Sequence, residues 1–79
     1  MTIHVKLSAS LRRHIASYDP YQGIEMEARP GLTVSEVMAD LGIPPAGVKI
    51  IMLNGRHAKT EQPINDGDRL SLFPAVGGG

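Results

Sequence analysis

Residues 33–53 read TVSEVMADLGIPPAGVKIIML, a helix pattern followed by a strand pattern. Thr33 and Glu36 have the spacing of a capping box, in which each side chain accepts a hydrogen bond from a backbone N–H at the start of a helix. Gly42 is placed to end this helix, and the prolines after it prevent its continuation. One apolar stripe predicts that a single side of the helix packs against a sheet; it consists of Val34, Val37, Met38 and Leu41.

Strand patterns lie on both sides of this helix. Residues 48–53 are apolar and branched apart from Lys49, which predicts a largely buried strand. The Asn54-Gly55 dipeptide that follows is a strong hairpin signal, because both residues accept positive φ. Strict alternation predicts half-buried strands at 2–7 and 21–28. The other predicted elements are a short helix or helical turn at 8–18, a return strand at 56–59, a connection at 60–68 anchored by Ile64, and a last strand at 69–73 whose pairing Pro74 halts.

The order of these elements indicates the fold class. A chain of 79 residues holds one domain with a thin core. A long helix that crosses between strands predicts an α+β fold of the β-grasp (ubiquitin-like) kind, with a mixed four- to five-stranded sheet packed on one main helix. The expected boundaries are a β-grasp domain at residues 1–74 and a flexible C-terminal glycine tail at 75–79.

Composition argues against several kinds of protein. Eight basic residues balance eight acidic ones, and the aromatic residues are one Phe and two Tyr. The chain therefore lacks the basic surplus and the stacking residues that are typical of nucleic-acid binders. Without cysteine the chain forms no disulfides, thiolate metal sites or cysteine nucleophiles. It lacks a signal-peptide pattern and any apolar stretch of membrane-spanning length. We therefore expect a cytoplasmic protein that binds neither nucleic acid nor a membrane.

The titratable residues do not form a catalytic or metal-binding pattern. His4, His14 and His57 are not spaced as known ligand sets are, so solvated histidines and no metal are expected. The run Asp66-Gly67-Asp68 lacks the other ligands of a calcium loop and is interpreted as a turn. Since no serine–histidine–acid set or paired carboxylates stand out, we expect no bound cofactor and no independent enzyme activity.

The chain ends in Gly77-Gly78-Gly79, which ordinary folding does not explain. At average glycine usage, three final glycines arise by chance in roughly one chain in 3,000. Glycine at a loose end gives no benefit to folding, because its backbone entropy is the largest of any residue. Taken alone, these residues fit a frayed end as well as a functional tail.

The context of the tail resembles the ThiS/MoaD family of ubiquitin-like sulfur-carrier proteins. The resemblance spans essentially the whole chain: the β-grasp element order, the Leu53-Asn54-Gly55 hairpin, the connection from Pro63 to Asp68, and the Phe-Pro-x-Val-Gly-Gly ending. It implies that a ubiquitin-activating-type enzyme adenylates the carboxylate of Gly79 with ATP and Mg²⁺. A persulfide sulfur donor then converts it to a thiocarboxylate, whose sulfur passes to a sulfur-accepting synthase subunit.

The resemblance also assigns roles to single residues. Phe73 matches an aromatic residue with which relatives dock onto partner enzymes, although core packing explains it equally well. In the same way Gly79 carries the sulfur, Gly78 occupies the second glycine position and Gly77 is an extra tail residue. The set expected to bind partners is Phe73, Pro74, Val76, Gly77 and Gly78.

The pathway and two other functions stay open. The ending is closest to the molybdopterin synthase small subunit, so biosynthesis of the molybdopterin cofactor is favoured over thiazole synthesis for thiamine. Leu7-Ser8, in place of an aromatic pair, and His57, in place of an apolar residue, depart from that branch, however, and cysteine synthesis or tRNA thiolation also fit. The alternatives in other classes are a ubiquitin-like protein modifier conjugated through Gly79 and a passive β-grasp protein-interaction module.

Overall fold

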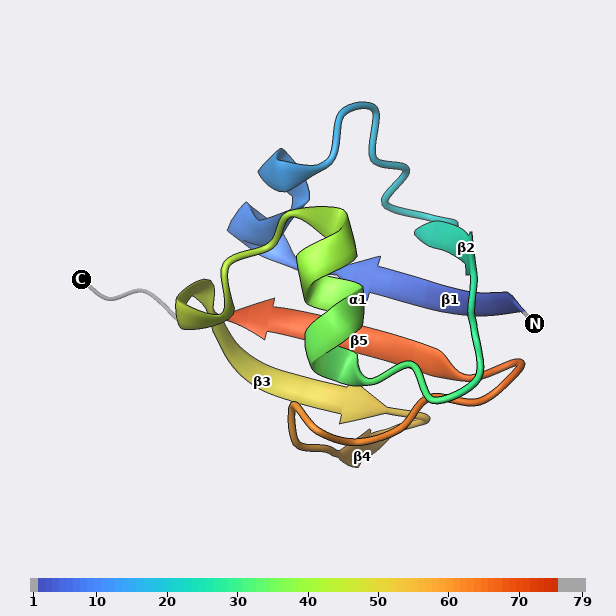
Figure 1. Ribbon diagram of the computed structural model, residues 1–79. Helices are drawn as coiled ribbons and strands as arrows, with labels where there is room; N and C mark the ends of the chain where they lie inside the picture. The colour runs from blue at the N-terminus through green and yellow to red at the C-terminus, as the bar shows by residue number, and fades with distance from the viewer. Residues whose placement is uncertain (1, 76–79) are drawn as a thin grey trace.

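A five-stranded mixed sheet with one α-helix across it forms the chain in the computed structural model, which describes residues 2–75 (Figure 1). In chain order the elements are β1 (Thr2–Leu7), the 3₁₀ helix η1 (Ala9–His14), β2 (Ile24–Glu27), α1 (Val34–Leu41), the 3₁₀ turn η2 (Pro45–Gly47), β3 (Val48–Leu53), β4 (Arg56–His57) and β5 (Arg69–Pro74). The strand order is β2-β1-β5-β3-β4. The predicted α+β, β-grasp fold is confirmed.

The first and last strands are parallel neighbours within the sheet. β1 pairs with β5 so that Val5 lies beside Leu70 and Leu7 beside Leu72, and all other strand pairs are antiparallel. Parallel strands require a long crossover connection, and here α1 lies within it. Its apolar stripe meets the sheet, and α1 crosses the same face of β1, β5 and β3 (Figure 1).

Both ends of α1 form as the sequence predicts. The Thr33 hydroxyl accepts a hydrogen bond from the Glu36 N–H at 3.3 Å, and the Glu36 carboxylate accepts one from the Thr33 N–H at 3.0 Å. At the other end Gly42 adopts the left-handed conformation, with φ 73°. The N–H of Ile43 then donates to the carbonyl of Met38 at 2.9 Å, which satisfies one of the last carbonyls of the helix.

The core is a single apolar layer between the helix and the sheet. Ile64 anchors the 60–68 connection in it as predicted, and its N–H donates to the Leu32 carbonyl at 2.7 Å. Within residues 2–75, every buried side chain is apolar. The buried residues are Ile3, Val5, Leu7, Leu11, Leu32, Val34, Val37, Met38, Ile43, Ile64, Leu70 and Leu72.

The elements between β1 and α1 are shorter than predicted. In place of a helix at 8–18 there is a 3₁₀ helix that ends at His14. The second strand begins at Ile24 instead of residue 21, because the Asp19 carboxylate accepts hydrogen bonds from the N–H groups of Tyr21 and Gln22 at 2.8 and 3.2 Å and holds this segment in a turn.

Three predictions about strands β3, β4 and β5 were wrong in detail. β3 is only partly buried, on the side that faces the core, and Ile50 is 36% exposed, because no second layer covers the opposite face in the described chain. The return strand β4 ends at His57. β5 continues through Pro74, which lies opposite Val48, because a proline at the last strand position lacks only the donor and keeps its carbonyl acceptor.

Candidate functional site

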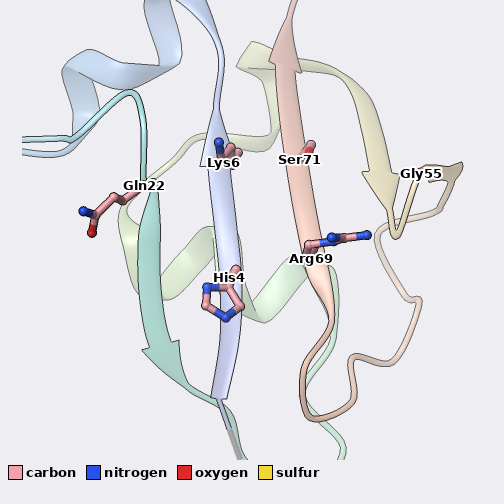
Figure 2. Close-up of a pocket in the computed structure, with 6 residues that line it drawn as sticks. All are labelled: His4, Lys6, Gln22, Gly55, Arg69 and Ser71. Atoms are coloured by element: carbon pink, nitrogen blue, oxygen red, sulfur yellow. The ribbon is translucent and has the colours of Figure 1, made fainter.

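The sheet face that points away from α1 is the candidate functional surface. Side chains alternate along a strand, so the residues between the buried ones must point to this open face. Among them His4, Lys6 and Arg69 are all exposed. Figure 2 shows these side chains in front of the sheet, with the green ribbon of α1 behind it.

A shallow hollow of about 320 Å³ lies on this open face, and we call it the basic depression. Strands β1 and β5 form its floor, and their parallel register places His4 beside Arg69 and Lys6 beside Ser71. Its lining residues are His4, Lys6, Gln22, Gly55, Arg69 and Ser71 (Figure 2). Three of the six can carry positive charge, and none is acidic.

The hairpin after β3 fixes the backbone beside the basic depression. Asn54 and Gly55 have φ angles of 52° and 81°, as the predicted Asn-Gly hairpin requires. The Asn54 side chain then joins the hairpin to β5: its amide nitrogen donates to the Asp68 carboxylate, and its oxygen accepts from the Arg69 N–H, both at 2.9 Å. A second hollow, of about 510 Å³, is lined by residues of this hairpin, among them Asn54 and Arg56.

An apolar pair adjoins the basic depression on the same face. Ile50 of β3 lies opposite Phe73 of β5, one position from the core pair Ile51 and Leu72. Phe73 is half-buried and lies outside the apolar core. The open face therefore carries exposed apolar surface where β5 ends.

A small ionic network around Arg29 lies on the helix side of the sheet. Arg29 contacts the carboxylates of Glu36 and Asp40 at 3.6 and 3.2 Å. Hydrogen bonds from the backbone N–H and the hydroxyl of Thr33 hold the pKa of the Glu36 carboxyl below its usual value, and the nearby charge of Arg29 acts in the same direction. Thr33 and Glu36 stabilise the start of α1, Asp40 lies near its end, and none of these groups belongs to the open face.

The histidines are exposed, as expected from their positions. His4 is the one near an acid on the open face, with 3.9 Å between its Nδ1 and the Glu25 carboxylate. Over residues 2–75, no three histidine or acidic side chains are grouped closely enough to hold a metal ion. In the same part of the chain, helices long and apolar enough to cross a membrane are absent.

The structure describes part of the predicted site. Phe73 and Pro74 form the end of β5, and Ala75 after them is exposed. The predicted residues Val76, Gly77, Gly78 and Gly79 lie outside the described residues, as does most of the proposed 75–79 tail. Sequence analysis missed Ile50 and the basic depression, although the outward positions of the alternating strands carried a signal for Lys6 and Arg69.

Comparison with known proteins identifies the family. The model of the ThiS family matches residues 5–79. This chain belongs to the ThiS family. The predicted resemblance to ThiS/MoaD proteins is thereby confirmed, and the chain is a small ThiS/MoaD-like protein with the ubiquitin fold. The comparison with curated proteins gave no match.

Solved structures with the same fold include two kinds of small protein. SAMP1 from Haloferax volcanii is 24% identical with a TM-score of 0.73, each chain being covered in full. A putative molybdopterin converting factor subunit 1 from Pyrococcus furiosus is 21% identical with a TM-score of 0.72, and 95% of this chain and 98% of that one are covered.

A third structure is a complex of subunits 1 and 2 of the molybdopterin-converting factor from Helicobacter pylori. The matched chain is 25% identical to this ThiS-family chain, with a TM-score of 0.63 and full coverage of both. The similar structures thus include a subunit of a two-protein assembly. They also include a protein described as a small archaeal modifier, which is 21% identical with a TM-score of 0.73 over 95% of this chain and 98% of its own.

Proposed function

We propose that this ThiS-family chain is a sulfur carrier whose Gly79 carboxylate is adenylated and converted to a thiocarboxylate. One observation carries the proposal: the family match extends through residue 79 and so includes the three final glycines. The thiocarboxylate would donate its sulfur in cofactor biosynthesis. The chain itself would be a substrate or small subunit of its partner enzymes, with no catalytic activity of its own.

The chemistry explains why the carrier ends in glycine. A carboxylate is a poor electrophile, so it must first be activated by a partner of the ubiquitin-activating type, which uses ATP and Mg²⁺. Transfer of the adenylyl group to the Gly79 carboxylate releases pyrophosphate. The outer sulfur of a donor persulfide then displaces AMP, and a thiol reduces the resulting acyl disulfide to the thiocarboxylate. Glycine allows the backbone to approach ATP closely, because it has no side chain to clash.

The folded body would serve as the handle for these partners. A terminal carboxylate offers little recognition surface, so binding energy from remote contacts must position it. The position of half-buried Phe73 beside the exposed Ile50, near the end of β5, supports the proposed partner-binding role of Phe73. Pro74, Val76, Gly77 and Gly78 would then lead the chain from that contact to the adenylating centre.

The favoured acceptor is a synthase subunit of a molybdopterin-type pathway. The Helicobacter pylori neighbour, a complex of molybdopterin-converting factor subunits 1 and 2, supports this choice. Thiazole synthesis uses the same carrier chemistry and is the alternative pathway. Incubation of the thiocarboxylate form with each type of synthase, followed by assay of the product, separates them.

A protein modifier is the second candidate function. The structural similarity to the small archaeal modifier protein of Haloferax volcanii favours it. Activation of Gly79 would be the same, but an amine on a target protein would displace AMP and form an amide. Species of higher mass on a denaturing gel, dependent on Gly79, would support this function.

Deletion of Gly78 and Gly79 tests the carrier. After incubation with an adenylating enzyme, ATP and a persulfide donor, the intact mass of the full chain should increase by the exchange of one oxygen for sulfur. The shortened chain should show no increase while its thermal unfolding is unchanged. A Glu61→Gln variant is the control, because this exposed residue of the 60–68 connection, near the start of α1, should not affect loading. Sulfur loading of the shortened chain would contradict the proposal.

A further inference from the structure

We infer that the basic depression docks an acidic segment on the surface of the adenylating partner. The inference rests on the proposed function for the identity of that partner. It depends on three properties of the open face: cations that converge on one hollow, a backbone that is held rigid beneath them, and a charge pattern that fits a protein surface.

The cations converge because of the fold. Lys6 comes from β1 and Arg69 from β5, and the parallel register sets the two strands side by side, with His4 next to Arg69. Within residues 2–75 neither Lys6 nor Arg69 forms an ion pair, whereas Arg29 on the helix side contacts two carboxylates. The charges of Lys6 and Arg69 are therefore available to a partner, whereas His4 lies 3.9 Å from the Glu25 carboxylate.

The backbone beneath these side chains is fixed. Asn54 accepts a hydrogen bond from the Arg69 N–H at 2.9 Å, and its own N–H donates to the Arg69 carbonyl at 2.8 Å. Lys6 donates one hydrogen bond to the Tyr21 carbonyl at 3.0 Å, and an ammonium group has three donors in all. Carboxylates of a partner would thus meet one ammonium that is already held and one guanidinium that is carried on a fixed backbone, and the restriction of Lys6 lowers the entropy lost on binding.

The surroundings of the basic depression favour a protein over a nucleic acid. Glu25 and Glu27 are exposed on β2, beside β1, so a continuous phosphate backbone crossing the sheet would meet carboxylates. On the other side lies the apolar Ile50–Phe73 pair. A partner surface on which an acidic segment adjoins an apolar patch would complement the basic depression and the neighbouring Ile50–Phe73 pair. Such a partner would also cover the end of β5, from which the chain continues towards the tail.

The role of this contact would be to bring the carrier to the enzyme and orient it. Complementary charges raise association rates and fix the orientation of a complex, and their effect decreases with salt. The basic depression would therefore affect the concentration of carrier needed for loading. It would not affect the chemical step, because it lies on the body of the domain and holds no reacting atom.

Charge reversal at two exposed positions tests the inference. The variant K6E/R69E and the wild-type chain are compared for direct binding to the adenylating enzyme and for the rate of thiocarboxylate formation. Binding should weaken, and KM should rise, by roughly tenfold or more, whereas kcat at saturating carrier stays near that of the wild type. Added salt should weaken binding of the wild type and hardly change that of the variant. The milder K6Q/R69Q, which should show a smaller shift of the same kind, serves if charge reversal impairs folding.

The control variant R13E/K59E makes the same change in net charge outside the basic depression. Equal weakening by this control, or no weakening by K6E/R69E, would overturn the inference. So would binding of a single-stranded DNA oligonucleotide that K6E/R69E abolishes while enzyme binding stays intact. The mass gain of the wild-type chain reports on the proposed function separately: its absence, with binding that K6E/R69E weakens, would overturn the carrier and support the docking surface.

Discussion

Glu36 combines two roles at the start of α1. Its carboxylate completes the capping box with Thr33 and lies 3.6 Å from Arg29. A negative charge in the first turn also interacts favourably with the helix dipole. All of these interactions favour the ionised carboxyl, which is why its pKa lies below the usual value in the folded chain.

The Glu36→Gln variant removes this charge, so the difference in stability between it and the wild type should depend on pH. A lowered folded-state pKa means that the stabilisation is complete above the unfolded-state pKa and is lost as the pH falls through the folded-state pKa. The urea midpoint of the wild type should therefore exceed that of the variant at neutral pH, and the difference should vanish in acid. Glu61→Gln is the control. A difference that stays constant across the pH series would contradict the assignment.

At the scale of the element, α1 depends on Gly42 to end it. This residue has φ 73°, and a Cβ added there would meet no atom within 4 Å. Any cost of Gly42→Ala must therefore come from the backbone conformation, which disfavours a side chain by roughly 1–2 kcal/mol. Gly47→Ala is the matched control, because Gly47 also has open space but no positive φ. Urea unfolding should show the loss for the first variant alone; equal stabilities would show that the helix end tolerates alanine.

Elements with local signals could be predicted from the sequence, and those set by tertiary context could not. The capping box, the terminal Gly42 and the Asn54-Gly55 hairpin each depend on residues close in sequence, and all three are confirmed. The exposure of Ile50 depends on whether a second layer covers the sheet, which its own strand does not encode. The start of β2 was missed because the Asp19 side chain competes for the backbone of a strand-like segment.

The same distinction holds for the candidate site. Phe73 and Pro74 could be predicted from a linear motif at the end of the chain. Lys6 and Arg69 could not, because more than sixty positions separate them and only the parallel register brings them to one hollow. The roles of Val76, Gly77, Gly78 and Gly79 stay predictions.

At the scale of the molecule, stability depends on one thin apolar layer. A domain of 79 residues has a total stability of roughly 4–12 kcal/mol. Leu72 is fully buried in β5, between β1 and β3, and Leu72→Ala should cost about 2–5 kcal/mol. This variant should unfold at a much lower urea concentration. Ile50→Ala, on the open face of the neighbouring strand, should stay within about 0.5 kcal/mol of the wild type. Similar losses for both would mean that the open face is packed.

The parallel pairing of β1 with β5 also determines how the molecule resists force. The two strands point the same way, so Thr2 and the end of β5 lie at opposite ends of the sheet (Figure 1). Tension between these points slides one strand along the other and loads all of their hydrogen bonds at once. An antiparallel hairpin pulled from its open end separates one bond at a time. Force applied between the start of β1 and the end of β5 would therefore meet more resistance than force that opens an antiparallel hairpin.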